Sequence, residues 1–447
     1  MRRSVLASLI VSLLGASIAH ANGRAPQTIG IYPKPGEPQT LYLATTFGLL
    51  ETKDEGCTFR WMCEQSIGYS GTWDPAYAIG SDGTIFATTP EKGLRVSRDG
   101  GCSFVSATAE LPTADPNRIA DIWIDALDIG PTGEVWVGTA ETAHTNDVFV
   151  STDNGMTFTP RGMQSPEIWW KSVKVAPSNP STVYITGYQV AGTPTAYVYR
   201  STNGGMQWTP SPLANVMLAA TPVLRVKAVD PTNPDVVYVV SENSNPPAGD
   251  RLYRSSDGGM TWTEVLAATA SIHDVLIRDA DHIIVATQIK AMSSIMGGPA
   301  YVSSSGGTSF EPLGGAPQLA CVAKRADGTL FGCGANWDPD FKAVAKSEDG
   351  GATWAKVWRF VEIAGAVQCG EGSVQHDTCD VAQWDCPSCA TDLKRQFGAK
   401  GPTCGAEATD PPMPPPKHTG CCDASSGSAA SSLLSLFVLA CLLKRRR

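Results

Sequence analysis

The sequence has little that would let it bind nucleic acids. Its 34 Lys and Arg residues are outnumbered by 43 Asp and Glu residues, the net charge is −9, and no basic run occurs outside the two ends. A surface this acidic repels phosphate groups. Nucleic-acid binding is therefore excluded, and nothing supports binding of the main body to a membrane surface.

Several motifs of catalysis and cofactor binding are absent as well. The chain has no strained turn carrying a nucleophilic Ser or Cys, no glycine-rich phosphate loop, and no metal-binding spacing among its six His residues. These are the short signatures of many hydrolases, nucleotide-binding enzymes and metalloenzymes. The sequence thus predicts no metal and no cofactor.

What the chain contains instead is one short phrase, repeated seven times. The copies begin 45, 54, 50, 54, 48 and 44 residues apart, at Thr52, Ser97, Ser151, Ser201, Ser255, Ser303 and Ser347. The fifth copy, Ser-Ser-Asp-Gly-Gly-Met-Thr-Trp, is typical. Its Ser and Asp side chains can bond nearby backbone amides and its glycines allow a positive φ, which together close a turn. A period of 40–50 residues is typical of propeller blades.

Each repeat also predicts four short strands. In the fourth repeat, alternating apolar residues mark strands at Ser172–Pro177, Thr182–Thr186 and Ala196–Arg200, and a further strand follows the phrase. Seven such units fill residues 27–360. The sequence therefore predicts an all-β fold, a seven-bladed β-propeller with four-stranded antiparallel blades and a small Cys-rich C-terminal appendix. Four strands in the first unit argue against strand exchange between the termini.

The repeated phrase resembles the Asp-box, or BNR repeat, of sialidases, sortilin-type receptors and plant photosystem assembly factors. The resemblance covers residues 27–360 at the level of the repeat pattern, with seven copies in register. Single seven-bladed propellers of the assembly-factor type, which are non-catalytic binding scaffolds, are the most similar overall, although this chain lacks their basic patch. A residue that builds the same turn in every blade cannot serve one active site, so we interpret the aspartates of the phrase as turn locks.

The two ends are typical of targeting segments. Two arginines, an apolar stretch and the small residues Ala19-His20-Ala21 predict a signal peptide over residues 1–21, with a membrane anchor as the alternative. At the far end, Cys421 and Cys422 precede a short apolar run and four basic residues. This pattern resembles the MYXO-CTERM sorting tail of myxobacterial surface proteins, which implies display at, or release from, the cell surface. A plain C-terminal tail anchor is the alternative.

Thirteen cysteines predict disulfides in an exported protein. Cys321 and Cys333 flank a hairpin turn symmetrically and are predicted to pair. An odd number crowd the segment after the last blade and predict a stapled appendix with one cysteine paired elsewhere or free: Cys369, Cys379, Cys386, Cys389 and Cys404. Half a zinc site at Cys386 and Cys389 is the alternative, but it lacks a second pair. The partners of Cys57, Cys63 and Cys102 stay open.

These observations divide the chain into five parts. They are a signal peptide (1–21), a propeller (22–360), a Cys-rich appendix (361–405), a Pro-rich stalk (406–420) and a sorting segment (421–447). Without the six basic residues of the two targeting ends, the net charge of −9 would become about −15.

Three tryptophans precede the predicted inner strands at the same distance. Trp73, Trp123 and Trp169 stand six residues before Ile79, Ile129 and Val175. Inner strands of a propeller line its axial channel, so the three rings would meet near one mouth, close to Asp74 and Asp125. Exposed Trp beside carboxylates can hold sugar rings or peptide side chains. We therefore predict a ligand-binding surface formed by Trp73, Trp123, Trp169, Trp170 and Lys171. The alternative is that these rings only pack between blades.

A sialidase-like enzyme is the activity that the phrase implies, but the residues it needs are missing. That family uses three arginines, one of them in an Arg-Ile-Pro phrase, whereas Arg118-Ile119 here lacks the proline and lies in the wrong unit. Sialidases also have six blades, and xyloglucan-cleaving enzymes with Asp-boxes have two propellers. Glycoside hydrolysis needs only two carboxylates, however, and Asp74 with Asp125 is one possible pair.

The sequence therefore predicts an exported, monomeric, cell-surface propeller that binds a protein or polysaccharide without catalysis. A glycoside hydrolase that uses Asp74 and Asp125 is the alternative. A structural coat protein without a ligand is a third hypothesis. Contact with the membrane is expected only through the C-terminal tail.

Overall fold

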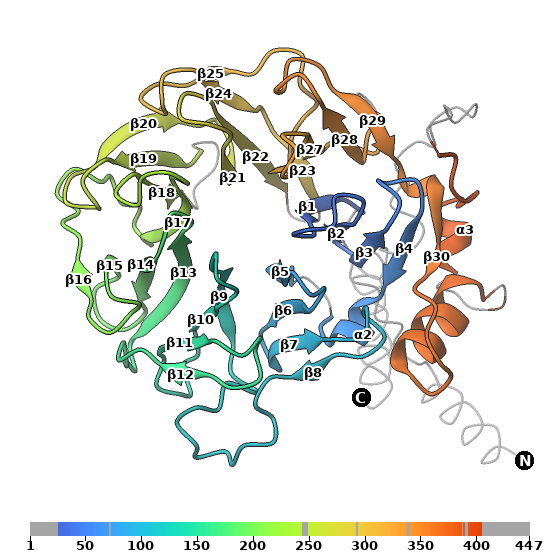
Figure 1. Cartoon of the computed structure of the whole chain (residues 1–447), viewed down its shortest axis with the longest axis horizontal. Coiled ribbons are helices and arrows are strands. Elements are labelled where there is room, and N and C mark those ends of the chain that lie inside the picture. The colour runs from blue at the N-terminus through green and yellow to red at the C-terminus, as the bar shows by residue number, and fades with distance from the viewer. Residues whose placement is uncertain are drawn as a thin grey trace, which may run out of the picture.

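The computed structural model describes residues 26–404, except for residues 71–72, 244–248, 292–293, 338–339, 387 and 389–391. Seven sheets stand around a central axis, which confirms the predicted all-β, seven-bladed fold (Figure 1). The predicted signal peptide, the stalk, and the sorting segment with Cys421 and Cys422 lie outside the described residues. Within the described part of the chain, no helix is long and apolar enough to span a membrane.

Each blade is built from four strands that follow one another in the chain. The inner strands surround the axis: β1 (Thr28–Pro33), β5 (Tyr77–Ile79), β9 (Ile124–Ile129), β13 (Ile168–Ala176), β17 (Val223–Val229), β21 (Ser271–Ile277) and β26 (Cys321–Lys324). The second strands are β2 (Leu41–Thr45), β6 (Ile85–Thr89), β10 (Val135–Thr139), β14 (Asn179–Gln189), β18 (Val237–Glu242), β22 (Ile283–Ala291) and β27 (Leu330–Cys333).

The outer half of each blade is shorter. The third strands are β3 (Gly48–Thr52), β7 (Gly93–Ser97), β11 (Val148–Ser151), β15 (Thr195–Ser201), β19 (Arg251–Ser255), β24 (Tyr301–Ser303) and β28 (Val344–Ser347). The fourth strands are β4 (Phe59–Met62), β8 (Val105–Ser106), β12 (Thr159–Pro160), β16 (Thr209–Pro210), β20 (Thr263–Ala267), β25 (Glu311–Pro312) and β29 (Ala355–Trp358). The remaining elements are β23 (Ser294–Gly297), β30 (Ile363–Ala366), α2 (Glu64–Ile67), η1 (Phe360–Glu362), η2 (Gln375–Trp384) and α3 (Leu393–Gln396).

The hydrophobic cores lie between neighbouring blades. Between blades two and three, Phe86 and Val96 of one blade pack with Val137 and Phe149 of the next. Phe158, the aromatic residue that closes the third copy of the repeated phrase, is buried in the same core. Side chains alternate across each strand, so one face of a sheet serves one core and the other face serves the next.

The seven copies of the phrase form nearly identical turns between the third and fourth strands. In the fifth, the amide of Gly259 donates to Ser255 Oγ at 2.8 Å, and the amide of Thr261 donates to Asp257 Oδ1 at 2.9 Å. The hydroxyl of the first residue accepts the same glycine bond in all seven copies. Hydrogen bonds from Thr261 and Thr353 lower the pKa of Asp257 and Asp349 to about 2. The interpretation of these aspartates as turn locks is confirmed.

The segment after blade seven closes the ring from outside. Strand β30 pairs in parallel with β4, so blade one has five strands instead of the predicted four, and its fifth strand comes from the far end of the chain (Figure 1). Blade one contains its own four consecutive strands, as predicted, but the addition of β30 from the far end of the chain was not predicted. We call residues 363–404 the strap.

Disulfides fix the strap to the first two blades. The bonds Cys57–Cys404, Cys63–Cys379 and Cys102–Cys369 each join a blade cysteine to a strap cysteine. The expectation of an appendix stapled mainly to itself is therefore wrong, because three of its five cysteines pair with the three that had no partner in sequence. Cys386 is also disulfide-bonded, as predicted against the zinc alternative. The predicted Cys321–Cys333 bond is confirmed, with the two residues directly opposite in β26 and β27.

Candidate ligand-binding site

Four consecutive inner strands carry a β-bulge. The pairing register shifts at Asp125 in β9, Lys171 in β13, Lys227 in β17 and His273 in β21. A bulge inserts one extra residue into a strand and re-aims its side chain, and bulges are frequent beside functional sites. In blades three, four and six the bulge thus presents a polar side chain in the first half of the inner strand, whereas Lys227 lies two residues before the end of β17.

Trp73, Trp123 and Trp169 form a continuous row at this end of the blades. The ring centroids of Trp73 and Trp123 are 4.8 Å apart, with the rings edge to face at 86°. Those of Trp123 and Trp169 are 6.0 Å apart and tilted by 36°. All three side chains are partly exposed. The prediction that the three rings meet is confirmed, and ligand binding by them stays a prediction.

These three tryptophans differ from the rest. The other nine of the twelve lie in, or directly against, the hydrophobic cores between blades or under the strap: Trp61, Trp136, Trp170, Trp208, Trp262, Trp337, Trp354, Trp358 and Trp384. Trp73, Trp123 and Trp169 belong to none of the cores. The three rings contact one another across neighbouring blades and their indole nitrogens are buried, so ligand binding and packing between blades both stay predictions.

Trp170 must be removed from the candidate surface. It is only 1% exposed and packs in the core between blades three and four. Neighbouring residues of a strand point to opposite faces, so Trp170 faces away when Trp169 faces the channel mouth. Its ring fits there because Gly138 and Gly187 have no side chain, and a Cβ at Gly138 would lie 2.7 Å from Trp170 Cβ.

Charged side chains beside the row are joined in a network across three blades. Lys171 Nζ forms an ion pair with Asp125 and lies 5.7 Å from the ring centroid of Trp169. Arg225 Nη1 lies 3.6 Å from Asp125 Oδ1, and Arg225 Nε donates to Glu242 Oε1 at 2.6 Å. Burial lowers the pKa of Arg225, but the carboxylates of Asp125 and Glu242 raise this pKa by more than burial lowers it. The guanidinium therefore stays charged.

A second ion pair continues this network along the channel. Lys174 Nζ lies 2.6 Å from Asp128 Oδ1, and the amide of Val175 donates to Asp128 Oδ2 at 2.9 Å. Sequence reasoning missed both this pair and the partners of Asp125. The signal was present, since Asp125 and Asp128 have the same spacing as Lys171 and Lys174, 46 residues further on.

Asp74, the other carboxylate predicted as catalytic, has a different environment. It follows Trp73 and lies near the phenols of Tyr69 and Tyr77, which are 6% and 5% exposed. Burial raises the pKa of both phenols well above its usual range, and the charge of Asp74 raises it further.

Two further polar residues near the channel make hydrogen bonds through backbone carbonyls. Lys227 Nζ donates to the carbonyl of His273 at 2.7 Å, across blades five and six. Glu167 is exposed, and its carbonyl accepts a hydrogen bond from Val190. No three His, Cys, Asp or Glu side chains in the described ranges are grouped closely enough to hold a metal ion.

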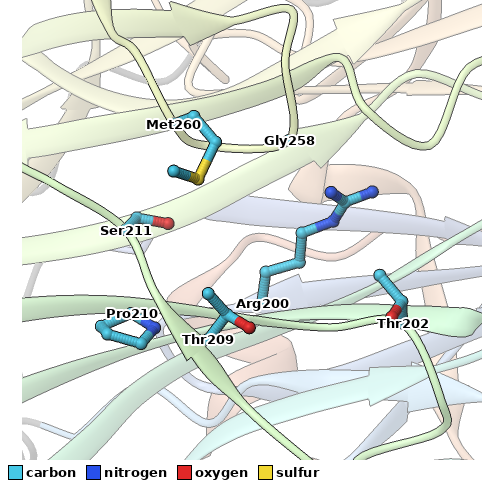
Figure 2. A pocket seen from close by; sticks show the side chains of 7 residues that line it. All are labelled: Arg200, Thr202, Thr209, Pro210, Ser211, Gly258 and Met260. Carbon is cyan, nitrogen blue, oxygen red and sulfur yellow. The ribbon is translucent and has the colours of Figure 1, made fainter.

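The opposite end of the blades carries the repeated turns. Each third strand ends there, level with the end of the inner strand, as Ser151 and Ile129 on either side of Val135 show. A small pocket at this end lies between blades four and five (Figure 2). Arg200 reaches into it from β15, Met260 faces it from the fifth turn, and Arg200 forms an ion pair with Asp235. With its cation already paired, this shallow pocket is not a candidate site.

Comparisons with known proteins find the fold but no family. No family model and no curated protein matches the chain. Among solved structures, the GH74 xyloglucanase from Xanthomonas campestris is similar at 17% identity over 74% of this chain and 66% of that enzyme, with a TM-score of 0.44. YCF48 from Cyanidioschyzon merolae is similar at 14% identity over 69% and 95% of the two chains, with a TM-score of 0.46. A PL25 ulvan lyase matches at 10% identity over 65% and 85%, with a TM-score of 0.41. These likenesses carry no argument about activity.

Proposed function

We propose that the chain is an exported propeller that binds a protein or polysaccharide, without catalysis, at the mouth formed by Trp73, Trp123 and Trp169. The observation that carries the proposal is the row of three touching, partly exposed rings that belong to no core. Tryptophans are the residues most enriched at binding hot spots, because a rigid ring offers a large contact area at a small entropy cost. The disulfides of the described residues fit an exported protein.

The site offers a preorganised surface. Aromatic contacts hold the three rings against one another, and the bulged residues Asp125 and Lys171 form an ion pair that holds Lys171 over Trp169. A ligand would therefore meet side chains whose rotamers are already fixed, which lowers the ordering cost of binding. Lys171 and Asp125 act here as positioning residues for the aromatic row.

A glycoside hydrolase remains the second candidate, and one observation favours it. Asp74 directly follows Trp73 in the chain, so a carboxyl group stands next to the aromatic row that would hold a sugar. Asp125, its predicted partner, is engaged by two cations. Solved propellers of similar fold include enzymes that act on polysaccharides as well as YCF48, so the fold alone does not choose.

The test is a glycan and secretome array probed with the purified mature protein. Binding predicts a ligand that is retained by the wild type, lost in a Trp73→Ala/Trp123→Ala variant, and released intact. Reducing-sugar release that is lost in Asp74→Asn or Asp125→Asn would favour the hydrolase. Absence of any ligand on either array would favour a structural coat protein.

A further inference from the structure

We infer that the tryptophan row binds an uncharged sugar ring, as opposed to an anionic glycan or a charged peptide. The inference rests on the proposed function and specifies the ligand of that same site. It follows from the way the charges of the channel wall are paired and from the geometry of the rings.

The charges of the wall neutralise one another. The inner strands of blades three and six carry carboxylates, at Asp125, Asp128 and Asp274, and the two blades between them carry cations. Across the boundary of blades three and four, Lys171 pairs with Asp125 and Lys174 pairs with Asp128. Each of these two ion pairs is complete without a ligand.

The next blade continues the balance. Arg225 is shared between Asp125 and Glu242, and its Nη1 also donates to the carbonyl of Lys171 at 2.5 Å. Asp274 Oδ2 accepts a hydrogen bond from the amide of Val322 at 3.1 Å. Sites that recognise anions instead aim charged donors at the place where the ligand sits, often several at once. Here the donors are directed at groups of the protein itself.

The rings provide what an uncharged sugar requires. The apolar face of a sugar ring stacks on an aromatic ring, and its hydroxyl groups exchange hydrogen bonds with polar side chains around it. Trp73 and Trp123 meet edge to face and form an apolar corner, while the face of Trp169 has Lys171 above it. We therefore expect the sugar to contact Trp73 and Trp123 more than Trp169.

The test compares matched oligosaccharides by tryptophan fluorescence and isothermal titration calorimetry with the purified mature protein. The probes are uncharged hexasaccharides of glucose and of mannose, a hexagalacturonate, and sulfated glucose oligosaccharides. We expect binding of an uncharged probe, at least tenfold tighter than any anionic one and nearly independent of salt. Trp123→Ala should lower that affinity at least tenfold, whereas the control Met206→Ala, on an exposed residue of a repeated turn at the opposite end, should leave it unchanged.

Charge variants give a second, independent readout. Glu242→Gln removes a partner of Arg225 at a position whose side chain is 35% exposed, so the variant should fold. It is expected to bind the anionic probes more tightly, with an affinity that falls as salt rises, because a guanidinium has lost part of its compensation. No change in anion affinity would contradict the paired-charge argument.

The outcomes separate this inference from the proposed function. Preferred binding of galacturonate or sulfated probes, or of a charged peptide, that is lost in Trp123→Ala would overturn the uncharged-sugar inference and keep the binding site. Binding of every probe unchanged in Trp123→Ala would overturn both.

Discussion

The two ends of the blades differ in how strictly they repeat. At one end, all seven turns have the same glycine-to-hydroxyl bond, and their polar groups are directed inward at their own backbone. At the other end, blades two, three and four each contribute one tryptophan to the row, and the bulged residues there are Asp125, Lys171 and His273. Strict repetition thus accompanies a structural role, and departure from the repeat accompanies the candidate site.

The repeated-turn end also contains two of the three disulfide anchor points of the strap. The residue after the last glycine is Cys57 in the first turn and Cys102 in the second, and both are linked to the strap. In turns three, four and five the same position is Met156, Met206 and Met260, each more than half exposed. The turn places this residue at the outer rim of the blade. Where the residue is a cysteine, as in turns one and two, a disulfide links the rim to the strap.

Loss of a strap disulfide should produce the largest change in stability. Cys63→Ala/Cys379→Ala removes a bond between residues 316 positions apart and is expected to lower the free energy of unfolding by about 2–5 kcal/mol. Thermal unfolding followed by circular dichroism measures it. The matched control, Cys321→Ala/Cys333→Ala, opens a separation of only 12 residues and should cost less, because a shorter closed loop constrains the unfolded chain less. An equal or larger cost in the control would show that the strap does not close the ring.

Removal of one turn lock should have a smaller effect. Ser255→Ala deletes the hydroxyl that accepts a hydrogen bond from Gly259 inside a buried turn, and should lower stability by about 1 kcal/mol. Binding at the tryptophan row should not change, since that row lies at the other end of the blades. A variant with normal stability and weakened binding would break the distinction between the two ends.

Acid should affect the two ends in opposite directions. The folded pKa of Asp257 and Asp349 lies near 2, below the value of about 3.9 in an unfolded chain, so the stability they contribute is present above about pH 4 and is lost as the pH falls toward 2. Burial raises the pKa of Asp147, which precedes β11 at the mouth end, so its contribution is present in acid and is lost as the pH rises through that pKa. Thermal midpoints between pH 2 and 7 should fall less steeply on the acid side in Asp257→Asn than in the wild type, and an identical slope would contradict this assignment.

The weakest turn offers a small gain. In the sixth turn Ser305 stands where five copies have Asp and the fourth has Asn203, and its Oγ accepts the amide hydrogen bond of Ser309 at 3.2 Å. Ser305→Asp adds a second acceptor oxygen for the hydroxyl of Ser309 and should stabilise the protein by about 0.5–1 kcal/mol. A thermal midpoint at or below that of the wild type would show that the turns are not interchangeable.

The repeat made most of the fold predictable from sequence. Seven phrases in register gave the blade number, the strands of blade four and the Cys321–Cys333 pair, because each depends on contacts between residues close in sequence. The strap was not predictable, since Cys63 and Cys379 are brought together only when the ring closes. The alignment of the inner strands predicted that Trp73, Trp123 and Trp169 meet. It did not predict that Trp170 faces the core. Side-chain direction depends on the bulge at Lys171, which sequence spacing does not reveal.

The central claim is that the tryptophan row is a binding surface and the repeated turns are not. The most direct measurement compares the wild type, Trp73→Ala/Trp123→Ala and Ser255→Ala on the same glycan and secretome array. The account predicts a ligand that the wild type and Ser255→Ala retain and that the double tryptophan variant loses by about 30-fold or more, with its thermal midpoint nearly unchanged. Equal retention by the double tryptophan variant would contradict it.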